Sequence, residues 1–363
     1  MRKIYYIVGA RPQFMQASMV SKALLDIKGI DFKIIHTGQH FDKKMSDIFF
    51  DELEIPKPYK NLNVNTLNHG AMVGRIMERL EELLISERPE FIIVDGDTNS
   101  TLAGALVAAK LKIKSLHIEA GMRSFDMAMP EEINRIMTDN GCTYLYCPTE
   151  TAYRNLKDAN LDHKARIVGD VLYDAFSFYR PKSEGKAVSI LKEKGLTEDD
   201  FILLTIHREE NLENRQKMAA IFQSLSNTDT PILFPVHPRT EQIINKYDID
   251  IKGIKNIYSI KPVGYLEMLD MEINSSCIIT DSGGVQREAY WSKKPVFILR
   301  NTTEWVEQLE TGWAILVRDA DLNDLPEIIS STISSLKIEK YIDFYGDGSA
   351  SYKIAKDIEE FIR

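Results

Sequence analysis

Short apolar runs alternate with longer segments of helical period along almost all of this 363-residue chain. The segment 71–87 carries apolar residues at three- and four-residue spacing, which is typical of an amphipathic helix. Strands that alternate with helices form parallel sheets with helices on both faces, so the pattern predicts an α/β fold. We expect strands at 4–8, 32–36, 91–94, 115–118, 144–147, 167–168, 201–205, 232–234, 257–259, 277–280 and 295–299.

The alternation pauses over 173–199, where polar residues and a Pro-Lys-Ser-Glu-Gly stretch replace it, and then restarts. A chain of this length also favours two domains over one. We expect one Rossmann-like domain at 1–171, a second at 172–350, and a last helix at 351–363 that packs back on the first domain. Sheets of this kind bind ligands at the carboxyl ends of their strands, so we expect a ligand between the two domains.

The charge balance argues against several classes of partner. The 45 Lys and Arg residues against 54 Asp and Glu residues give a net charge of −9, which disfavours nonspecific binding to nucleic acid or to an anionic membrane. The three cysteines, Cys142, Cys147 and Cys277, form no metal-like pattern and are expected to be buried free thiols. With no signal-peptide pattern and no apolar run near membrane length, we expect a cytoplasmic protein without a bound metal.

The motif TDSGGVQRE at 280–288 follows an apolar run and predicts an anion site. A tight Ser-Gly-Gly turn that opens a helix presents unpaired backbone N–H groups, and the helix dipole favours negative charge there. The glycines allow a phosphate to approach the backbone. A simple strand–helix turn would have the same pattern, so the motif needs support from the rest of the chain.

Polar clusters follow other predicted strands in the same way. These clusters are GARPQFMQ at 9–16, DGDTNST at 95–101, HIEAGMRS at 117–124, PEEINR at 130–135, the stretch from Thr205 to Asn211, and PVHPR at 235–239. Each residue also has a structural explanation: Asp97 as the cap of a helix starting at Thr98, Glu131 in a first helical turn, Arg11 on the surface, and His207 as a structural histidine. Their joint position at strand ends favours a binding cleft.

The motifs that are present and absent restrict the class of reaction that this chain is expected to catalyse. The chain has no GxGxxG after its first strand and no GxxxxGK[ST], which disfavours a dinucleotide redox cofactor and ordinary ATP hydrolysis. Carboxylates facing a sugar and cations facing a diphosphate are typical of a nucleotide-sugar enzyme. The carboxylates would move protons, while Arg11, His207 and the amides of 282–284 would stabilise a departing diphosphate.

These motifs resemble those of the non-hydrolysing UDP-N-acetylglucosamine 2-epimerases, in order, from Gly9 to Ser351. The patterns are GxRPxF, DGDTxST, HxEAGxRS, PEExNR, HRxEN, PVHP, TDSGGxQxE and YGDGxAS. The resemblance implies a glycosyltransferase-B-type fold, a homodimer, a UDP-sugar substrate and no cofactor. It also implies elimination of UDP across C1–C2 to a 2-acetamidoglucal, followed by re-addition with protonation on the opposite face, for surface polysaccharide synthesis.

The resemblance also implies roles by motif position. Asp97, Glu119 and Glu131 would be the acid/base carboxylates, and Arg11 and His207 would be catalytic contacts to the diphosphate. The implied substrate-binding residues are Gln16, Arg135, His237, Ser282, Gly283, Gly284 and Glu288, with Glu288 on the ribose.

Several positions depart from the common family pattern. Gln16 stands at the lysine of GTRPEAIK, Trp305 replaces an arginine of TTERPE, and Arg287 stands where a second acid is common. An effector-loop pattern reads QHFDKKM at 39–45. Together with GARPQF and QHFD, the Gln16 and Trp305 substitutions resemble the branch acting on UDP-2,3-diacetamido-2,3-dideoxyglucuronic acid. The remaining alternatives are a hydrolysing epimerase, a UDP-sugar glycosyltransferase and a catalytically impaired UDP-sugar binder.

Overall fold

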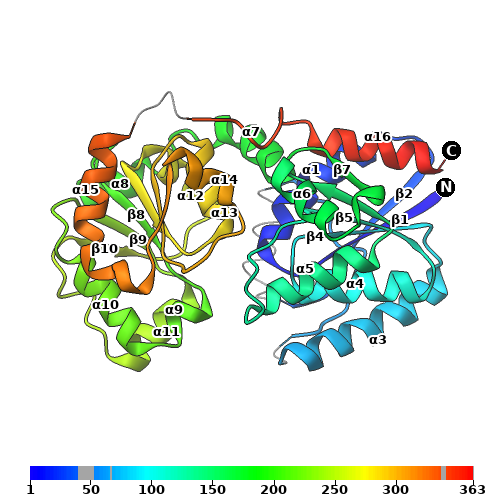
Figure 1. Cartoon of the computed structure of the whole chain (residues 1–363), viewed down its shortest axis with the longest axis horizontal. Coiled ribbons are helices and arrows are strands. Elements are labelled where there is room, and N and C mark those ends of the chain that lie inside the picture. Colours follow the sequence, from blue (N-terminus) through cyan, green and yellow to red (C-terminus); the bar gives the residue numbers. More distant parts are fainter. Residues whose placement is uncertain (40–52, 66–67, 337–340, 363) are drawn as a thin grey trace. The chain divides into compact units, whose positions relative to one another are not determined.

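The computed structural model describes residues 1–39, 53–65, 68–336 and 341–362 (Figure 1). The chain divides into two compact units, one formed by Met1–Ser177 and Asp343–Arg363 and the other by Phe178–Ile342. The sequence-based boundaries at 171/172 and 350/351 therefore differ from the observed division. The segments around Asp170 and Tyr345 belong to one unit because hydrogen bonds join them. The Asp170 N–H donates to the Tyr345 carbonyl, and the Ala350 N–H donates to the Asp174 carboxylate.

The first unit contains a seven-stranded sheet, within its described residues, in the order β3-β2-β1-β4-β5-β6-β7. Every neighbouring pair runs parallel. The strands are β1 (Arg2–Val8), β2 (Ile30–His36), β3 (Lys60–Asn61), β4 (Phe91–Asp95), β5 (Lys114–Ile118), β6 (Tyr144–Cys147) and β7 (Ala165–Ile167).

Helices cover both faces of this sheet. Figure 1 shows α3 (His69–Glu87), α4 (Asn99–Lys110) and α5 (Pro130–Gly141) on one face, with α1 (Arg11–Leu25) and α16 (Ala350–Ile362) on the other. The shorter elements of the unit are α6 (Glu150–Asp158) and η1 (Asp162–Lys164), and α7 (Val171–Ser183) begins in it.

The second unit has a parallel sheet in the order β10-β9-β8-β11-β12-β13. Its strands are β8 (Ile202–Thr205), β9 (Ile232–Pro235), β10 (Ile257–Ile260), β11 (Cys277–Thr280), β12 (Val296–Ile298) and β13 (Ala314–Leu316). Its helical elements are α8 (Val188–Lys194), α9 (Glu209–Leu212), α10 (Arg215–Leu225), α11 (Pro238–Tyr247), α12 (Tyr265–Asn274), α13 (Gly283–Trp291), α14 (Val306–Thr311), η2 (Asp319–Asp324) and α15 (Leu325–Ser335).

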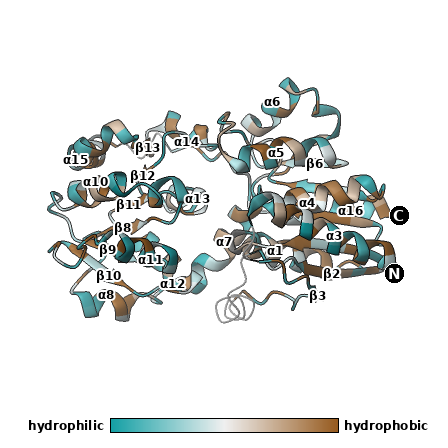
Figure 2. Cartoon of the chain, turned by 90° about the horizontal axis from the view of Figure 1, so that it is seen from below, coloured by the Kyte–Doolittle hydropathy of each residue, from teal (hydrophilic) through white to brown (hydrophobic). Residues whose placement is uncertain are grey.

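The central strands, such as β4 and β11, are mostly apolar and fully buried because both faces of each sheet are covered. In β8, Ile202 and Leu204 pack into the core cluster that includes residues of α10 and α15, whereas Leu203 packs into the cluster that includes residues of α8 and α12. This alternation follows from the two-residue period of a strand. Figure 2 shows the strands of both units as predominantly brown, apolar ribbons between helices of mixed colour.

Most predicted strands lie within a residue or two of the observed ones, but the sequence prediction misses several elements. The stretch 173–199, where the alternation of strands and helices pauses, holds most of α7, with Pro181 inside the helix, and all of α8. The short strand β3 consists of two polar residues, so no apolar run marks it, whereas β13 lies within the apolar run 313–317 and was missed despite that signal. The three cysteines are buried free thiols, as predicted.

The last helix packs on the first unit, as expected. Helix α16 contacts α1, and the Phe361 ring stacks on the Tyr144 ring at 4.2 Å between centroids. The buried Asp357 accepts a 2.7 Å hydrogen bond from the Tyr146 hydroxyl and pairs with Arg166. Across the described part of the chain, no helix combines the length and apolar character needed to span a membrane.

We expect Asp357→Ala to destabilise the protein. The substitution leaves the buried Tyr146 hydroxyl without its acceptor, which costs about 1–3 kcal/mol of unfolding free energy. Urea unfolding of the full chain measures this loss. The exposed Glu360 on the same helix provides the control, since Glu360→Ala should change the unfolding free energy by less than about 0.5 kcal/mol. Equal midpoints for the two variants would show that the buried hydrogen bond does not anchor α16.

Candidate active site

The candidate site of the first unit lies where the strand order reverses. Strands β1 and β4 are neighbours at this point, and the loops that follow them carry the GARPQF and DGDT motifs. The Gln13 side chain joins the two loops: its Oε1 accepts from the Gly9 and Ala10 N–H groups, and its Nε2 donates to the carbonyl and the carboxylate of Asp95. Sequence reasoning missed Gln13, although its place in GARPQF was a signal.

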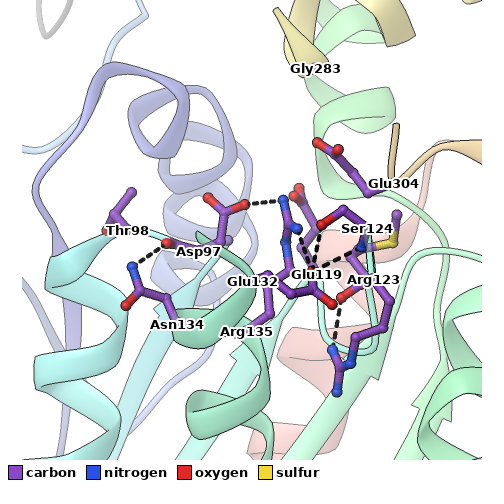
Figure 3. A network of polar contacts seen from close by, with 12 residues as sticks. Asp97, Thr98, Glu119, Arg123, Ser124, Glu132, Asn134, Arg135, Gly283 and Glu304 are labelled. Atoms are coloured by element: carbon purple, nitrogen blue, oxygen red, sulfur yellow. Dashed lines mark hydrogen bonds and ion pairs between the residues drawn. The ribbon is translucent and has the colours of Figure 1, made fainter. Parts of the chain in front are cut away.

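Asp97 is held by two residues of α5 (Figure 3). Arg135 Nη2 lies 2.6 Å from Asp97 Oδ2, and Asn134 Nδ2 donates to the Asp97 carbonyl at 2.8 Å. The capping explanation for Asp97 is wrong, because Thr98 is the N-cap of α4 and its hydroxyl accepts from the Thr101 N–H. The Asp97 carboxylate is therefore paired with a guanidinium, and its side chain remains 28% exposed.

The two adjacent glutamates of PEEINR have different environments. Glu132 is 1% exposed; it pairs with Arg135 and accepts from the N–H groups of Ser124 and Phe125 (Figure 3). Burial raises the pKa of Glu132, but the Ser124 and Arg135 contacts outweigh it and hold the pKa below its ordinary value. Glu131 is only partly buried. Glu132 is thus the anchor of the loop before α5, and Glu131 is the more accessible carboxylate.

Glu119 follows β5 in a strained backbone conformation. Its φ of +69° lies in the left-handed region, where non-glycine residues are uncommon and often functional. Gln16 Nε2 donates to Glu119 Oε2 at 2.8 Å. The residue at the family's lysine position therefore still contacts a predicted acid/base carboxylate, but as a neutral amide.

Asp95 is a second carboxyl group close to Glu119, and it is fully buried. The Tyr6 hydroxyl donates to it at 2.8 Å, and Gln13 Nε2 donates at 2.6 Å. Burial raises the pKa of Asp95 to about 8, because it outweighs the lowering by Tyr6 and Gln13, and the nearby charge of Glu119 raises it further. The first acid of DGDT is thus a buried, proton-binding group, whereas the second is ion-paired.

The candidate site of the second unit also lies where the strand order reverses, between β8 and β11. The buried Asp281 accepts from the His207 and Arg208 N–H groups and from Asn211 Nδ2. This holds the loop after β8 beside the start of α13. The rings of His207 and His237 lie 6.0 Å apart, so the two predicted histidines come together.

The Ser-Gly-Gly turn opens α13, as the sequence predicts. Ser282 is the N-cap, and Gly283 and Gly284 are the first two residues of the helix. The first N–H groups of a helix have no partner within it, so these amides are suited to an anion. One turn further, Glu288 accepts from the Tyr265 hydroxyl at 2.9 Å in a buried position.

Two departures from the common family pattern contact each other. The Arg287 guanidinium lies over the Trp305 ring, 4.1 Å from its centroid, and Arg287 Nε donates to the Gly283 carbonyl at 3.3 Å. Both side chains are buried. Trp305 therefore supports a cation beside the Ser-Gly-Gly turn.

The predicted site residues fall into two groups. Asp97, Glu119, Glu131, Gln16 and Arg135 belong to the first unit, and His207, His237, Ser282, Gly283, Gly284 and Glu288 belong to the second. Arg11 is the first residue of α1, but its side chain lies outside the described part of the structure, as do residues 40–45 of the QHFDKKM loop. Among the described residues, no group of three His, Cys, Asp or Glu side chains is arranged to hold a metal ion.

The raised pKa of Asp95 predicts a pH-dependent stability. Between about pH 4 and pH 8 the folded chain binds a proton at Asp95 that the unfolded chain releases, so this contribution to the unfolding free energy falls as pH rises. We expect Asp95→Asn to remove a decrease of up to about 1.4 kcal/mol per pH unit. Urea unfolding at several pH values measures the difference, with the exposed Asp158→Asn as control. Parallel pH curves for wild type and Asp95→Asn would contradict the assignment.

Comparison with known proteins identifies the family. A family model described as UDP-N-acetylglucosamine 2-epimerase matches residues 22–359. A UDP-N-acetylglucosamine 2-epimerase homolog of Methanococcus maripaludis is 46% identical over 356 residues, covering 98% of both chains. The UDP-2,3-diacetamido-2,3-dideoxy-D-glucuronate 2-epimerase of Pseudomonas aeruginosa is 43% identical over 363 residues, again covering 98% of both.

A solved structure agrees with these relatives. The Methanocaldococcus jannaschii UDP-GlcNAc 2-epimerase in complex with UDP-GlcNAc and UDP matches with a TM-score of 0.92 and 39% identity, covering 99% of each chain. The predicted family and the two-domain fold of glycosyltransferase-B type are confirmed. Since the family model and these relatives match nearly the whole length, the chain belongs to the UDP-N-acetylglucosamine 2-epimerase family.

Proposed function

We propose that this protein is an isomerase that inverts C2 of a UDP-2-acetamido sugar, of the UDP-GlcNAc to UDP-ManNAc type. The observation that carries the proposal is the chemical difference between the two strand-order reversals. The first unit carries Asp97 after β4, at its reversal, and Glu119 after the neighbouring β5, whereas the second unit has the helix start at Gly283 and Gly284. Proton transfer and diphosphate stabilisation are the two requirements of UDP elimination.

The reaction balances as an elimination followed by an addition. A carboxylate removes the proton from C2 while the C1–O bond to UDP breaks, and the electron pair forms the C1=C2 bond of a 2-acetamidoglucal. The UDP oxygen then bonds to C1 again, and a carboxylic acid delivers a proton to the opposite face of C2. Asp97, Glu119 and Glu131 are the candidates for these proton transfers.

The departing UDP carries the charge that must be stabilised. The amides of Gly283 and Gly284 at the start of α13 favour the diphosphate, with His207, His237 and Arg11 as further contacts. Glu288 would bind the ribose hydroxyls, and Arg135 and Gln16 would hold Asp97 and Glu119 in place on the sugar side. No step of this scheme requires a metal or a nicotinamide.

A second substrate is favoured by a specific observation. The buried guanidinium of Arg287, stacked on Trp305 beside the Ser-Gly-Gly turn, adds a cation that suits a sugar with an extra carboxylate. The Pseudomonas aeruginosa relative, at 43% identity, is named for such a uronic acid substrate. UDP-2,3-diacetamido-2,3-dideoxyglucuronic acid is therefore the alternative. Either product would supply surface polysaccharide synthesis, and the free buried cysteines suit a reducing cytoplasm.

Deuterium incorporation at C2 in heavy water tests the reaction and the substrate together. We expect the wild type to exchange the C2 proton and form the C2 epimer from UDP-GlcNAc or from the diacetamido uronic acid, as read by NMR. Asp97→Asn should lower the exchange rate by roughly 10²–10⁴-fold, because an amide cannot accept the proton. The exposed Asp158→Asn should leave the rate unchanged.

The same assay separates the alternatives. UDP that accumulates with free sugar would indicate a hydrolysing epimerase, and sugar transfer to an added acceptor would indicate a glycosyltransferase. Tight UDP binding without C2 exchange on either sugar would indicate a catalytically impaired binder and would overturn the proposed activity.

We also infer that two copies of the chain associate. Ile133 and Met137 are 44% and 46% exposed and lie one turn apart on α5, so they form an apolar strip on one face of the helix. Sedimentation velocity of the full chain should give a dimer. The double substitution Ile133→Glu and Met137→Glu should convert the dimer to a monomer, because it places charges on the apolar strip of α5. Ile85→Glu, at an exposed position of α3, is the control and should leave the dimer intact. A monomeric wild type would contradict the inference.

A further inference from the structure

The HIEAGMRS motif contains two basic residues, His117 and Arg123, to which the proposed chemistry gives no role. His117 is the fourth residue of β5 and is fully buried, and Arg123 in the following loop is 8% exposed. A buried His or Arg side chain needs hydrogen-bond or ion-pair partners, because it loses its hydration in the interior. Their contacts connect the turns that carry Asp97 and Glu119.

The His117 ring bridges a carboxylate and a carbonyl. Its Nδ1 lies 2.8 Å from Asp139 Oδ1, and its Nε2 lies 2.8 Å from the Gly96 carbonyl oxygen. Both partners are hydrogen-bond acceptors, since Asp139 is ionised as argued below. The ring therefore joins the Asp139 carboxylate of α5 to the turn that precedes Asp97. A hydrogen bond to an ionised carboxylate such as that of Asp139 is stronger than one between neutral groups.

Asp139 is the centre of the buried cluster. It also pairs with Arg123, whose Nη2 lies 2.7 Å from Oδ2, and it accepts from the Gly121 N–H at 3.3 Å. Burial alone would raise the pKa of Asp139, but the hydrogen bond and charge of His117, together with Arg123, hold the pKa below its ordinary value. The carboxylate thus stays ionised between two basic side chains.

The cluster fixes two turns of the first unit at once. Gly96 directly precedes Asp97, and Gly121 follows Glu119 by two residues. The second turn is conformationally demanding: Glu119 has a φ of +69° and Gly121 a φ of +81°, and a Cβ at Gly121 would lie 2.3 Å from the Ala152 carbonyl oxygen. Such backbone conformations persist only where surrounding contacts impose them.

We propose that His117 is a positioning residue for the epimerisation, acting through the Gly96 carbonyl on Asp97 and through Asp139 on Glu119. This role rests on the proposed function, because it assumes that Asp97 and Glu119 transfer the protons. His117 does not touch the substrate. It sets the spacing and direction of two carboxylates that must reach C2 from opposite faces, and a displacement of about 1 Å in such a group can cost roughly 100-fold in rate.

Two substitutions at His117 separate its two contacts. His117→Asn can keep a donor toward Asp139 but is too short to reach Gly96, whereas His117→Gln can keep a donor toward Gly96. We expect His117→Asn to lower kcat and C2 deuterium exchange by roughly 100-fold relative to wild type. We expect His117→Gln to lower both by only roughly tenfold. The affinity for UDP, whose proposed contacts lie in the second unit, should stay within about twofold of wild type for both variants. The exposed His163→Gln is the control and should behave as wild type.

The outcomes separate this role from its alternatives. Wild-type C2 exchange in folded His117→Asn would overturn the proposal, and so would a loss of UDP affinity parallel to the loss of kcat, which would indicate general disruption. If His117→Asn fails to fold, His117→Gln decides: full wild-type exchange or a parallel loss of UDP affinity overturns the role, and a selective loss of kcat supports it. A wild type that exchanges no C2 proton with any tested UDP-sugar would instead overturn the proposed function and this role with it.

Discussion

All strands of each sheet run parallel, so the loops that follow them emerge at one edge of the sheet. Segments far apart in the sequence, such as GARPQF and DGDT, become neighbours only through this register, in which β1 pairs with β4. The same holds for the loops after β8 and β11 in the second unit. If the register slipped, the apolar faces and the polar loops would be misplaced together.

Buried carboxylates then hold these loops by accepting backbone N–H groups. Asp281 binds the loop after β8, Glu132 binds the loop before α5, Asp139 binds Gly121, and Asp174 binds the start of α16. A buried carboxylate is costly unless it is paired and hydrogen-bonded, so each of these sites favours a single loop conformation. The positions of the candidate acid/base and anion-binding groups follow from that restriction.

The departures from the common family pattern are local and do not disturb this framework. Gln16 contacts Glu119 from the position of the family lysine, and Arg287 packs on Trp305 beside the Ser-Gly-Gly turn. Gln16 places a neutral amide beside Glu119 where the family pattern has a lysine, and Arg287 places a cation beside the Ser-Gly-Gly turn. The fold around these positions matches that of a family member over 99% of the chain.

The sequence by itself determined the fold class, the family and most strand positions, because short apolar runs and ordered motifs are local signals. It also marked the Ser-Gly-Gly helix start, since the turn and its glycines are adjacent in the chain. The sequence prediction missed α7 and α8: the buried residues of α7 do recur at helical spacing, but Pro181 lies inside that helix, and α8 is short and mostly polar.

Only the tertiary structure decided what neighbouring residues of one motif do. It distinguished buried Asp95 from ion-paired Asp97, and buried Glu132 from accessible Glu131. These differences depend on partners from other elements, such as Ser124 for Glu132, Arg135 for Asp97 and Tyr6 for Asp95. Burial and ion pairing depend on which elements the sheet brings together, so no local pattern in the sequence encodes them.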